Sequence, residues 1–377
     1  MPEDPWLGYR MKDLPTTFSM QRENATEKQA EVQQRYPFPG KLELRQEIAS
    51  KRADQTREQM HSVLVLLVTQ VRSAFADVFL VDKDIQVSLE HQRRLRDLVD
   101  IATSKYKVGP GLQQDVLNAD VALARIDSAL IELSRRRRSR EIQLATLLNQ
   151  DRVEIAPLGT LPAVALKQSP AVLEQMVLET NPDLRERERA VERDERAVRL
   201  ARMAPLPDIA VSAAYGSRVD HAPTVKVSKG KTTITETDRP DLLTGQIMFD
   251  IPVFYPWKQS EELQAAEADL RRNRARLEAA RRKAIDSLHD LLARLAQHEQ
   301  VAASFRDEVI PVARAAVSAS VSAYQVNRVD FLTLLAAQDN LDTYQTEYWR
   351  NEAERFRDLA EIDRVTGAVL TEDGWNR

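Results

Sequence analysis

The sequence predicts a mainly α-helical protein made of two copies of one unit, with long antiparallel helical hairpins and about four short transmembrane β-strands. Three observations predict this fold class. Two halves of the chain match at a fixed spacing, long stretches almost free of glycine and proline carry apolar residues every seven positions, and a few short segments alternate apolar and polar residues. We therefore expect helical rods joined at a few corners.

The internal repeat is found by subtracting residue numbers. Residues of the first half match residues 218 positions later: Tyr106 matches Tyr324, Val108 matches Val326, and Leu117 matches Leu335. Further upstream, Lys41 matches Lys258 at a spacing of 217, so one residue was inserted or lost between these points. The chain is therefore two copies of one unit.

Each copy is expected to hold the same elements in the same order. The first copy spans 1–150, with strands at about 6–11 and 29–38, a long helix at 41–106 and a return helix at 112–148. A linker or equatorial segment follows at 151–180. The second copy spans 181–367, with a helix at 182–204, strands at 208–219 and 242–254, a long helix at 258–324 and a return helix at 329–366, before a tail at 368–377.

Seven-residue spacing supports the long helices. Leu64, Val71 and Val78 form such a series in the first copy, and Leu263 and Leu270 begin another in the second. At ~1.5 Å per residue, each long helix would extend on the order of 100 Å, so the helices must pack side by side.

Punctuating residues predict local features of the helices and of one loop. Pro311 is expected to kink or unwind the second long helix. Asn181 is a candidate N-cap, with Pro182 at the first helical position. The segment from His221 to Pro240 is expected to be a solvated loop.

The alternating segments predict strands with one apolar face. The residues expected to face lipid are Ile209, Val211, Tyr215, Ile247, Phe249 and Ile251. A soluble, half-buried strand shows the same alternation, but these strands lie between rods that offer no sheet to pack on. About four strands cannot close a barrel, so the chain is expected to oligomerise around an axis.

Composition excludes several classes. With 30% charged residues, the chain is not expected to be a multi-span helical membrane protein. It has no uninterrupted apolar stretch of roughly 18 residues, so no transmembrane helix is expected. The net charge of -4, with both signs interleaved, gives no reason to expect nucleic acid as a partner. The start lacks a signal peptide, so either the protein is not exported or its true start is missing.

No pattern predicts catalysis, a cofactor or a metal site. The chain has no cysteine, and the five histidines, which show no helical pairing, are interpreted as exposed. The run Arg135 to Arg138 is interpreted as a solvated face. Gly109 and Gly111 suit a tight helix-helix turn that needs φ > 0. Asp115 and Asp330 are either N-caps or carboxylates that face a narrow axis.

Several segments together resemble the TolC family of outer-membrane efflux factors. They are Tyr36-Pro37-Phe38-Pro39-Gly40-Lys41-Leu42, Tyr106-Lys107-Val108-Gly109 with Asp115-Val116-Leu117, Asn181-Pro182-Asp183-Leu184, and Tyr324-Gln325-Val326-Asn327 with Asp330-Phe331-Leu332. The resemblance covers nearly the entire chain in order. The Pro-Phe-Pro-Gly-Lys corner most resembles the heavy-metal branch, the outer-membrane partners of Cus or Czc-type exporters.

The resemblance implies a passive exit duct for small molecules or metal ions, located in the outer membrane with a periplasmic extension. It implies a homotrimer whose strands, about twelve in all, form one barrel in outer-membrane lipid. It also implies a periplasmic adaptor protein and an inner-membrane pump as partners. The tip residues expected to contact the adaptor are Val108, Gly109, Gly111, Asp115, Leu117, Val326, Asn327, Asp330 and Leu332.

The sequence departs from the family in two ways. The family begins with an export signal and further helices before the first strand, and here these are absent, which suggests an N-terminal truncation. The aspartates that ring the entrance in some members are replaced by Thr333 and Ala336, so Asp115 and Asp330 become the candidates for an acidic ring.

Two other functions compete with the duct. A soluble coiled-coil scaffold would explain the heptads and the missing signal, but not the alternating strands. A periplasmic adaptor protein also carries a long helical hairpin, but only one, inserted among β-rich domains.

Overall fold

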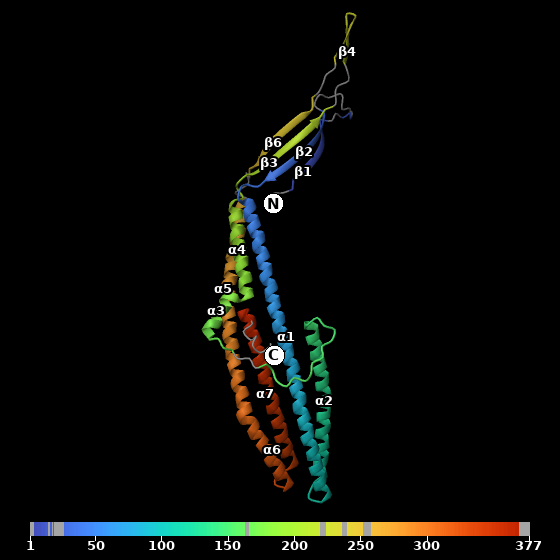
Figure 1. Ribbon diagram of the computed structural model, residues 1–377, viewed down its shortest axis with the longest axis vertical. Helices are drawn as coiled ribbons and strands as arrows, with labels where there is room; N and C mark the ends of the chain where they lie inside the picture. The colour runs from blue at the N-terminus through green and yellow to red at the C-terminus, as the bar shows by residue number, and fades with distance from the viewer. Residues whose placement is uncertain are drawn as a thin grey trace. The chain divides into compact units, whose positions relative to one another are not determined.

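The computed structural model describes residues 4–13, 16, 18, 26–162, 166–218, 224–235, 240–251 and 258–368. The chain divides into two compact units. Unit 1 consists of Met1–Gln55 and Arg187–Arg276, and unit 2 of Thr56–Glu186 and Leu277–Arg377. Both repeats contribute to both units, because each long helix begins in unit 1 and continues into unit 2 (Figure 1).

The helices follow the predicted repeat. The first copy has α1 (Lys41–Lys107) and α2 (Gln113–Leu147). The second has α4 (Pro182–Arg202), α5 (Gln259–Ser304), a π-helix (Phe305–Val309), α6 (Ile310–Gln325) and α7 (Phe331–Thr366). The fold is thus mainly α-helical with a small sheet, as predicted, and it contains two repeats.

The π-helix explains the change of repeat spacing from 217 to 218. It lies inside the second long helix, whereas α1 is α-helical throughout. A π-turn holds one more residue than an α-turn, so it takes up the extra residue while the helix continues. Pro311, which cannot donate a backbone hydrogen bond, lies two residues after the π-helix. The predicted irregularity at Pro311 is therefore a local π-helix at 305–309.

A helix lies in the segment at 151–180, which was predicted to be a linker or equatorial segment. Residues 151–162 have no helix or strand, but α3 (Pro170–Thr180) begins at Pro170. Leu173 and Val177 of α3 are fully buried against leucines of α5 and α7, in one apolar cluster of unit 2. The apolar face of this short helix, which the sequence analysis overlooked, explains why it forms.

Asn181 caps α4 as predicted. Its Oδ1 accepts a hydrogen bond from the backbone N–H of Leu184 at 3.0 Å, and its Nδ2 donates to the carbonyl of Val365 at 2.7 Å. The first bond satisfies a free donor at the helix start, and the second ties this corner to α7.

The four main strands form one antiparallel sheet in unit 1. They are β1 (Trp6–Lys12), β2 (Glu27–Tyr36), β3 (Asp208–Ser217) and β6 (Leu242–Asp250), in the spatial order β1-β2-β3-β6 (Figure 1). The central pair, β2 and β3, comes from different repeats. Residues 219 and 252–254, which were expected in strands, lie outside the described residues, as do 369–377 of the tail.

The loop predicted from His221 to Pro240 is instead partly a hairpin. Strands β4 (Thr224–Ser228) and β5 (Lys231–Thr235) pair in an antiparallel manner. Lys229 and Gly230 between them have φ of 51° and 77°, as a two-residue hairpin turn requires. The prediction gave too much weight to polarity and missed the β-branched residues on either side of this turn.

One helix of the described chain, α1, contains a window apolar enough by length and composition to cross a membrane. The sequence analysis expected no such window, and that expectation was wrong. It counted uninterrupted apolar residues, whereas a window of this kind tolerates up to two charged residues.

Candidate functional site

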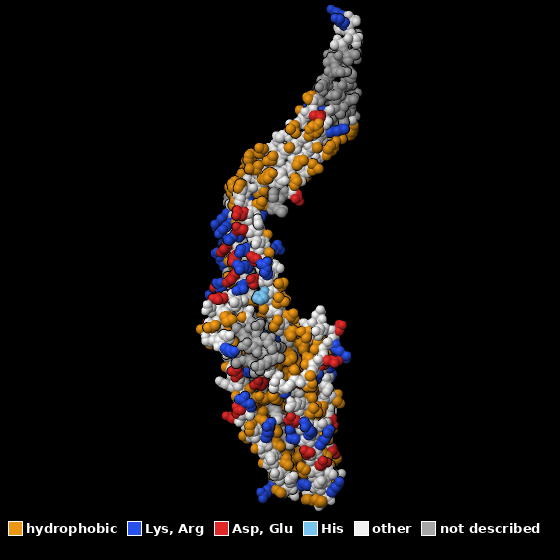
Figure 2. All heavy atoms as spheres, viewed as in Figure 1, with side chains coloured by type: hydrophobic (Ala, Val, Ile, Leu, Met, Phe, Trp, Pro, Cys, Tyr) orange, Lys and Arg blue, Asp and Glu red, His pale blue; other side chains and the backbone are white. Residues whose placement is uncertain are grey.

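One face of the sheet is apolar and exposed. Val211, Tyr215, Ile247, Phe249 and Ile251 are between 41% and 68% exposed. Ile209 is half-buried. The strand register continues this face across the sheet, because Val211 pairs with Ile247 and Ile209 pairs with Phe249. Figure 2 shows hydrophobic side chains gathered over these strands.

The opposite face of the sheet is polar on β2 and consists of the small residues Ala210, Ser212, Ala214 and Gly216 on β3. Glu27, Gln29 and Glu31 of β2 alternate with exposed residues, and Ser212 of β3 lies on the same buried side. Arg10 of β1 forms an ion pair with Glu31 across the sheet. A sheet that exposes its apolar face and turns polar and small residues inward is the reverse of a soluble half-buried sheet, and it suits a lipid exterior around a wet interior.

The corner between strand and helix is held by Lys41. Its side chain is 8% exposed, and Nζ donates to Asp208 Oδ1 at 2.8 Å and to the carbonyl of Leu206 at 2.6 Å. The backbone N–H of Phe38 donates to the same Asp208 oxygen at 2.9 Å. The strand-to-helix corner of the first repeat thus binds the junction between α4 and β3 of the second repeat within unit 1.

The two helix-turn-helix tips have equivalent backbones. Gly109 has φ of 98° and Asn327, at the equivalent position, has φ of 60°. Gly111 was expected to need a positive φ, but it does not have one. Instead, a Cβ there would lie 2.5 Å from the backbone nitrogen of Tyr106, so this position requires glycine for close packing.

The tips meet through Tyr324 at the end of α6. Its hydroxyl donates to Asp115 Oδ2 at 2.8 Å, and its ring stacks edge-on against Phe331 at 5.6 Å between centroids. Lys105 Nζ donates to the carbonyl of Tyr324 and lies 3.9 Å from the ring centroid. Burial, followed by the bond to Asp115, raises the pKa of Tyr324 well above its usual range, so the hydroxyl keeps its proton.

The predicted tip residues are placed at or near the two turns. Large apolar side chains among them are exposed, namely Val108, Leu117, Val326 and Leu332. The tips therefore expose apolar side chains at the ends of both helical hairpins.

The two candidate acidic residues differ. Asp330 is an N-cap, because its Oδ1 accepts from the backbone N–H of Thr333 at 2.7 Å, and hydrogen bonds from Thr333 lower its pKa. Asp115 is not an N-cap. It lies inside the first turn of α2, after Leu112, and its carboxylate accepts from Tyr324. Asp330 is exposed and Asp115 is half-buried.

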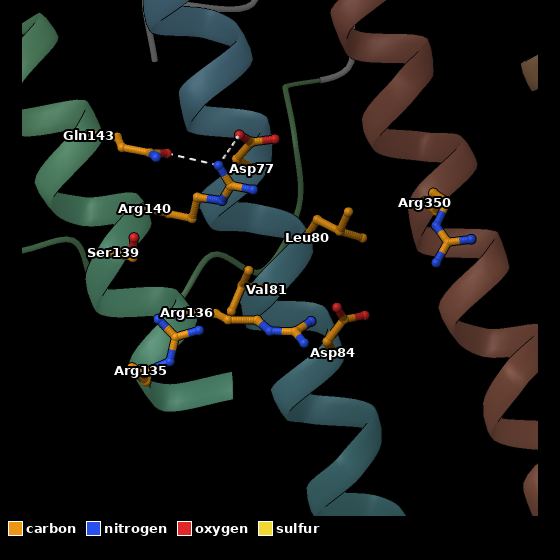
Figure 3. Close-up of a pocket in the computed structure, with 10 residues that line it drawn as sticks. All are labelled: Asp77, Leu80, Val81, Asp84, Arg135, Arg136, Ser139, Arg140, Gln143 and Arg350. Atoms are coloured by element: carbon orange, nitrogen blue, oxygen red, sulfur yellow. Dashed lines mark hydrogen bonds and ion pairs between the residues drawn. The ribbon is translucent and has the colours of Figure 1, made fainter. Parts of the chain in front are cut away.

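A charged pocket of about 490 Å³ lies among α1, α2 and α7 (Figure 3). Asp84 lies between Arg136 of α2 and Arg350 of α7, and its Oδ1 has no hydrogen-bond partner among the described residues. Burial raises the pKa of Asp84 to about 6, although the two arginines act in the opposite direction. Nearby, Arg140 pairs with Asp77 at 3.3 Å.

Two charged features predicted to be solvated are partly buried. His91 of α1 is 6% exposed and pairs with Asp342 of α7. Arg137 donates to Asp82 at 2.6 Å and to the carbonyl of Ile155 at 2.7 Å, and so fixes the segment after α2. Neither partner is near in sequence, so helical spacing gave no signal. The described residues contain no group of three or more acidic or histidine side chains placed to hold a metal ion.

Comparison with known proteins agrees with this geometry. The family described as outer membrane efflux protein matches residues 8–150 and 173–368. The chain therefore belongs to the outer membrane efflux protein family. No curated protein matches the chain in sequence.

Solved structures share the fold. The outer-membrane channel OprN is 17% identical with a TM-score of 0.78, over 97% of this chain and 81% of that one. The channel-forming protein CusC is 16% identical with a TM-score of 0.80, over 97% of this chain and 83% of that one. The MtrE channel of Neisseria gonorrhoeae is 16% identical with a TM-score of 0.76, over 98% and 81%. The family and these neighbours are channels, not enzymes, and the protein is an outer-membrane efflux component with a periplasmic helical part.

Proposed function

We propose that this chain is one protomer of a homotrimeric exit duct that works with a periplasmic adaptor protein and an inner-membrane pump. The observation that supports this most is the sheet of unit 1. Its exposed face is apolar, its other face carries polar and small residues, and β1 and β6 lie at its edges. Open edges are not tolerated in lipid, so β1 of one copy pairs with β6 of the next, and three copies close a barrel.

The six alternating residues Ile209, Val211, Tyr215, Ile247, Phe249 and Ile251 are proposed to face lipid. Their exposure supports this assignment. A charge on this face costs about 2 to 4 kcal/mol at mid-membrane, whereas a charge on the opposite face meets water. Phe249→Arg is therefore expected to block insertion into vesicles. Gln246→Arg, which places the same charge on the opposite face of β6, is expected to allow insertion.

The assembly is tested by size and conductance. The protein, produced behind an export signal and extracted in detergent, is expected to have the mass of a trimer by light scattering and to conduct ions in planar bilayers. A freely soluble monomer that never enters bilayers would contradict the proposal and favour a scaffold.

The tips are proposed to contact the adaptor. The exposed apolar residues Val108, Leu117, Val326 and Leu332 supply the contact area, and Gly109, Gly111 and Asn327 shape the turns. Val326→Asp is expected to abolish capture of a purified adaptor hairpin while the trimer remains intact. Unchanged capture would place the adaptor elsewhere.

An acidic ring is proposed at the entrance, formed by Asp330 and, more weakly, by Asp115. Asp330 supports this role because it is exposed and its lowered pKa keeps it ionised. Asp115 is half-buried, and its carboxylate already accepts a hydrogen bond from Tyr324. Three copies of an ionised carboxylate around an axis attract cations.

Small molecules or metal ions are the proposed cargo, and the metal alternative rests on the resemblance of the Pro-Phe-Pro-Gly-Lys corner to the heavy-metal branch of the family. In a bacterium whose own metal-export channel is deleted, production of this protein with its adaptor and pump is expected to restore growth on copper or zinc. Restored resistance to organic toxicants alone would assign another cargo.

A further inference from the structure

A pocket of about 230 Å³ lies in unit 2, where the π-helix continues into α6. Side chains of α1, of the π-helix and α6, and of α7 line it, so three segments that are distant in sequence meet there. Single π-helical turns occur frequently at functional sites. We call this cavity the π-helix pocket, and the residues of its wall that matter below are Val87, Glu90, Ile310, Arg314, Gln345 and Trp349.

Gln345 of α7 is a buried polar side chain in the wall of the π-helix pocket. It is 7% exposed, and its Oε1 has no hydrogen-bond partner among the described residues. A buried amide without a partner destabilises the fold, because the amide has given up its hydrogen bonds to water. Such a group beside a cavity is expected to pair with a molecule that enters the cavity.

The internal repeat shows why Gln345 has no partner. A shift of 218 carries Gln345 onto Asp127 of α2 and Ile310 of α6 onto Gln92 of α1. In the first repeat, the side chain of Gln92 donates to Asp127, so the long helix satisfies the polar group of the return helix. In the second repeat, the apolar Ile310 takes the place of that donor and lines the pocket. The second repeat therefore has the polar group without the partner.

Aromatic and aliphatic side chains form an apolar wall of the pocket. Val87, Ile310 and Trp349 belong to it, and the ring of Trp349 lies edge-on to that of Tyr348 at 4.6 Å between centroids. Tyr348 and Trp349 correspond to Leu130 and Ile131 in the first repeat, so the aromatic rings belong to the second repeat alone. Flat rings of this kind suit an aromatic ligand.

The charged groups of the pocket leave one cation available. Arg306 pairs with Asp307 at 2.9 Å, and Glu90 accepts from Gln86 at 3.2 Å. Arg314 forms no hydrogen bond or ion pair with any residue that the structure describes. Its guanidinium can therefore bind a carboxylate through two parallel hydrogen bonds.

We propose that the π-helix pocket binds a small aromatic carboxylate that carries a hydroxyl group. The carboxylate binds Arg314, the ring packs on Trp349, and the hydroxyl, which both donates and accepts, pairs with the amide of Gln345. A volume of about 230 Å³ admits one substituted ring and is smaller than the site of a drug-sized molecule. All of these residues lie in unit 2 of one chain, so the inference does not depend on the proposed trimer.

The probe is 4-hydroxybenzoate, titrated into the full chain in detergent and followed by ligand-observed NMR. For a ligand of this size, a Kd of about 0.1 to 1 mM is expected. Benzoate, which lacks the hydroxyl, is expected to bind about tenfold more weakly. Absence of saturable 4-hydroxybenzoate binding below about 10 mM overturns the proposal.

A third ligand tests the sign of the charge that the pocket selects, because Glu90 also lines it. In 4-hydroxybenzylamine an ammonium group replaces the carboxylate, and this ligand is expected not to bind. Binding of the amine as tight as that of 4-hydroxybenzoate overturns the assignment of an anion to Arg314.

Two variants test the contacts separately. Gln345→Leu removes the amide, so the preference for 4-hydroxybenzoate over benzoate is expected to vanish while benzoate binding is unchanged. Arg314→Gln is expected to weaken both ligands about tenfold, and Arg314→Lys to restore most of the binding. Arg96→Gln is the matched control, because Arg96 is the exposed equivalent of Arg314 in the first repeat, and it should change neither affinity.

The melting temperature of each variant shows that it is folded before the titration. A folded Gln345→Leu variant that still prefers 4-hydroxybenzoate overturns the proposed site, as does equal loss of binding in Arg314→Gln and Arg96→Gln.

Discussion

Tyr324 of α6 donates its hydroxyl to Asp115 of α2, a residue 209 positions earlier, and so joins the tip of the second hairpin to the first. The two residues are not equivalent in the repeat, since Tyr324 corresponds to Tyr106 and Asp115 to Thr333. The bond therefore breaks the twofold repetition of the tips and holds them together at one place.

Tyr324→Phe removes this bond and leaves the buried ring in place. Because a hydrogen bond to a charged group contributes about 2 kcal/mol, the melting temperature is expected to fall by a few degrees. In bilayers, conductance is expected to rise because the tips separate more easily. Tyr106→Phe, at the exposed equivalent position, is the control and should change neither quantity. Equal effects of both changes would remove the special role of Tyr324.

Asp330 combines a cap with a charge, and two substitutions separate these roles. Asp330→Asn keeps an acceptor for the N–H of Thr333, whereas Asp330→Ala loses it and is expected to lower the melting temperature. Both remove the charge, so both are expected to lower the cation preference measured by reversal potentials. An unchanged reversal potential in both variants would move Asp330 away from the path of ions.

The raised pKa of Asp84 leads us to expect that its contribution to stability falls as the pH rises. An ordinary salt-bridged carboxylate has the opposite pH dependence. Its pKa is about 6 in the folded protein, against 3.8 for an ordinary aspartate such as that of the unfolded chain. Between these pH values the folded protein therefore binds the proton more tightly than the unfolded chain does. This contribution to stability is therefore greatest below pH ~4 and is lost as the pH rises through ~6.

Asp84→Asn should abolish this dependence. At pH 7 we expect the variant to be more stable by about 1 to 2 kcal/mol, less than the full shift implies because water reaches part of the carboxylate. Near pH 4 the variant and the parent protein should denature at the same urea concentration. A variant that is less stable at pH 7 would show that the arginines of the pocket need the Asp84 charge.

Lys41 holds the strand-to-helix corner, and its loss leaves Asp208 without its cation. Lys41→Ala is expected to destabilise unit 1 by about 3 kcal/mol, because one partner of a largely buried pair is removed. Lys51→Ala removes a more exposed pair with Glu192 and is expected to cost less than about 1 kcal/mol. Hydrogen exchange of amides in β2 and β3 measures both effects, and similar protection in the two variants would contradict the role given to Lys41.

Much of the fold could be predicted because its signals are local. Heptad spacing predicts the long helices, alternation predicts β2, β3 and β6, and Asn181-Pro182 predicts the start of α4. The hairpin β4–β5 and helix α3 were missed because short elements surrounded by polar residues carry weak periodicity. The π-helix was signalled only by the change in repeat spacing.

The sequence by itself determined the twofold repeat, the class of fold and the amphipathic strands, because each depends on residue spacing along the chain. The tertiary structure decided which distant residues meet. Lys41 reaches Asp208, His91 lies against Asp342, and Tyr324 binds Asp115, although no spacing relates the members of these pairs. Packing of helices from different repeats creates these contacts, and their energy depends on burial that the order of residues does not specify.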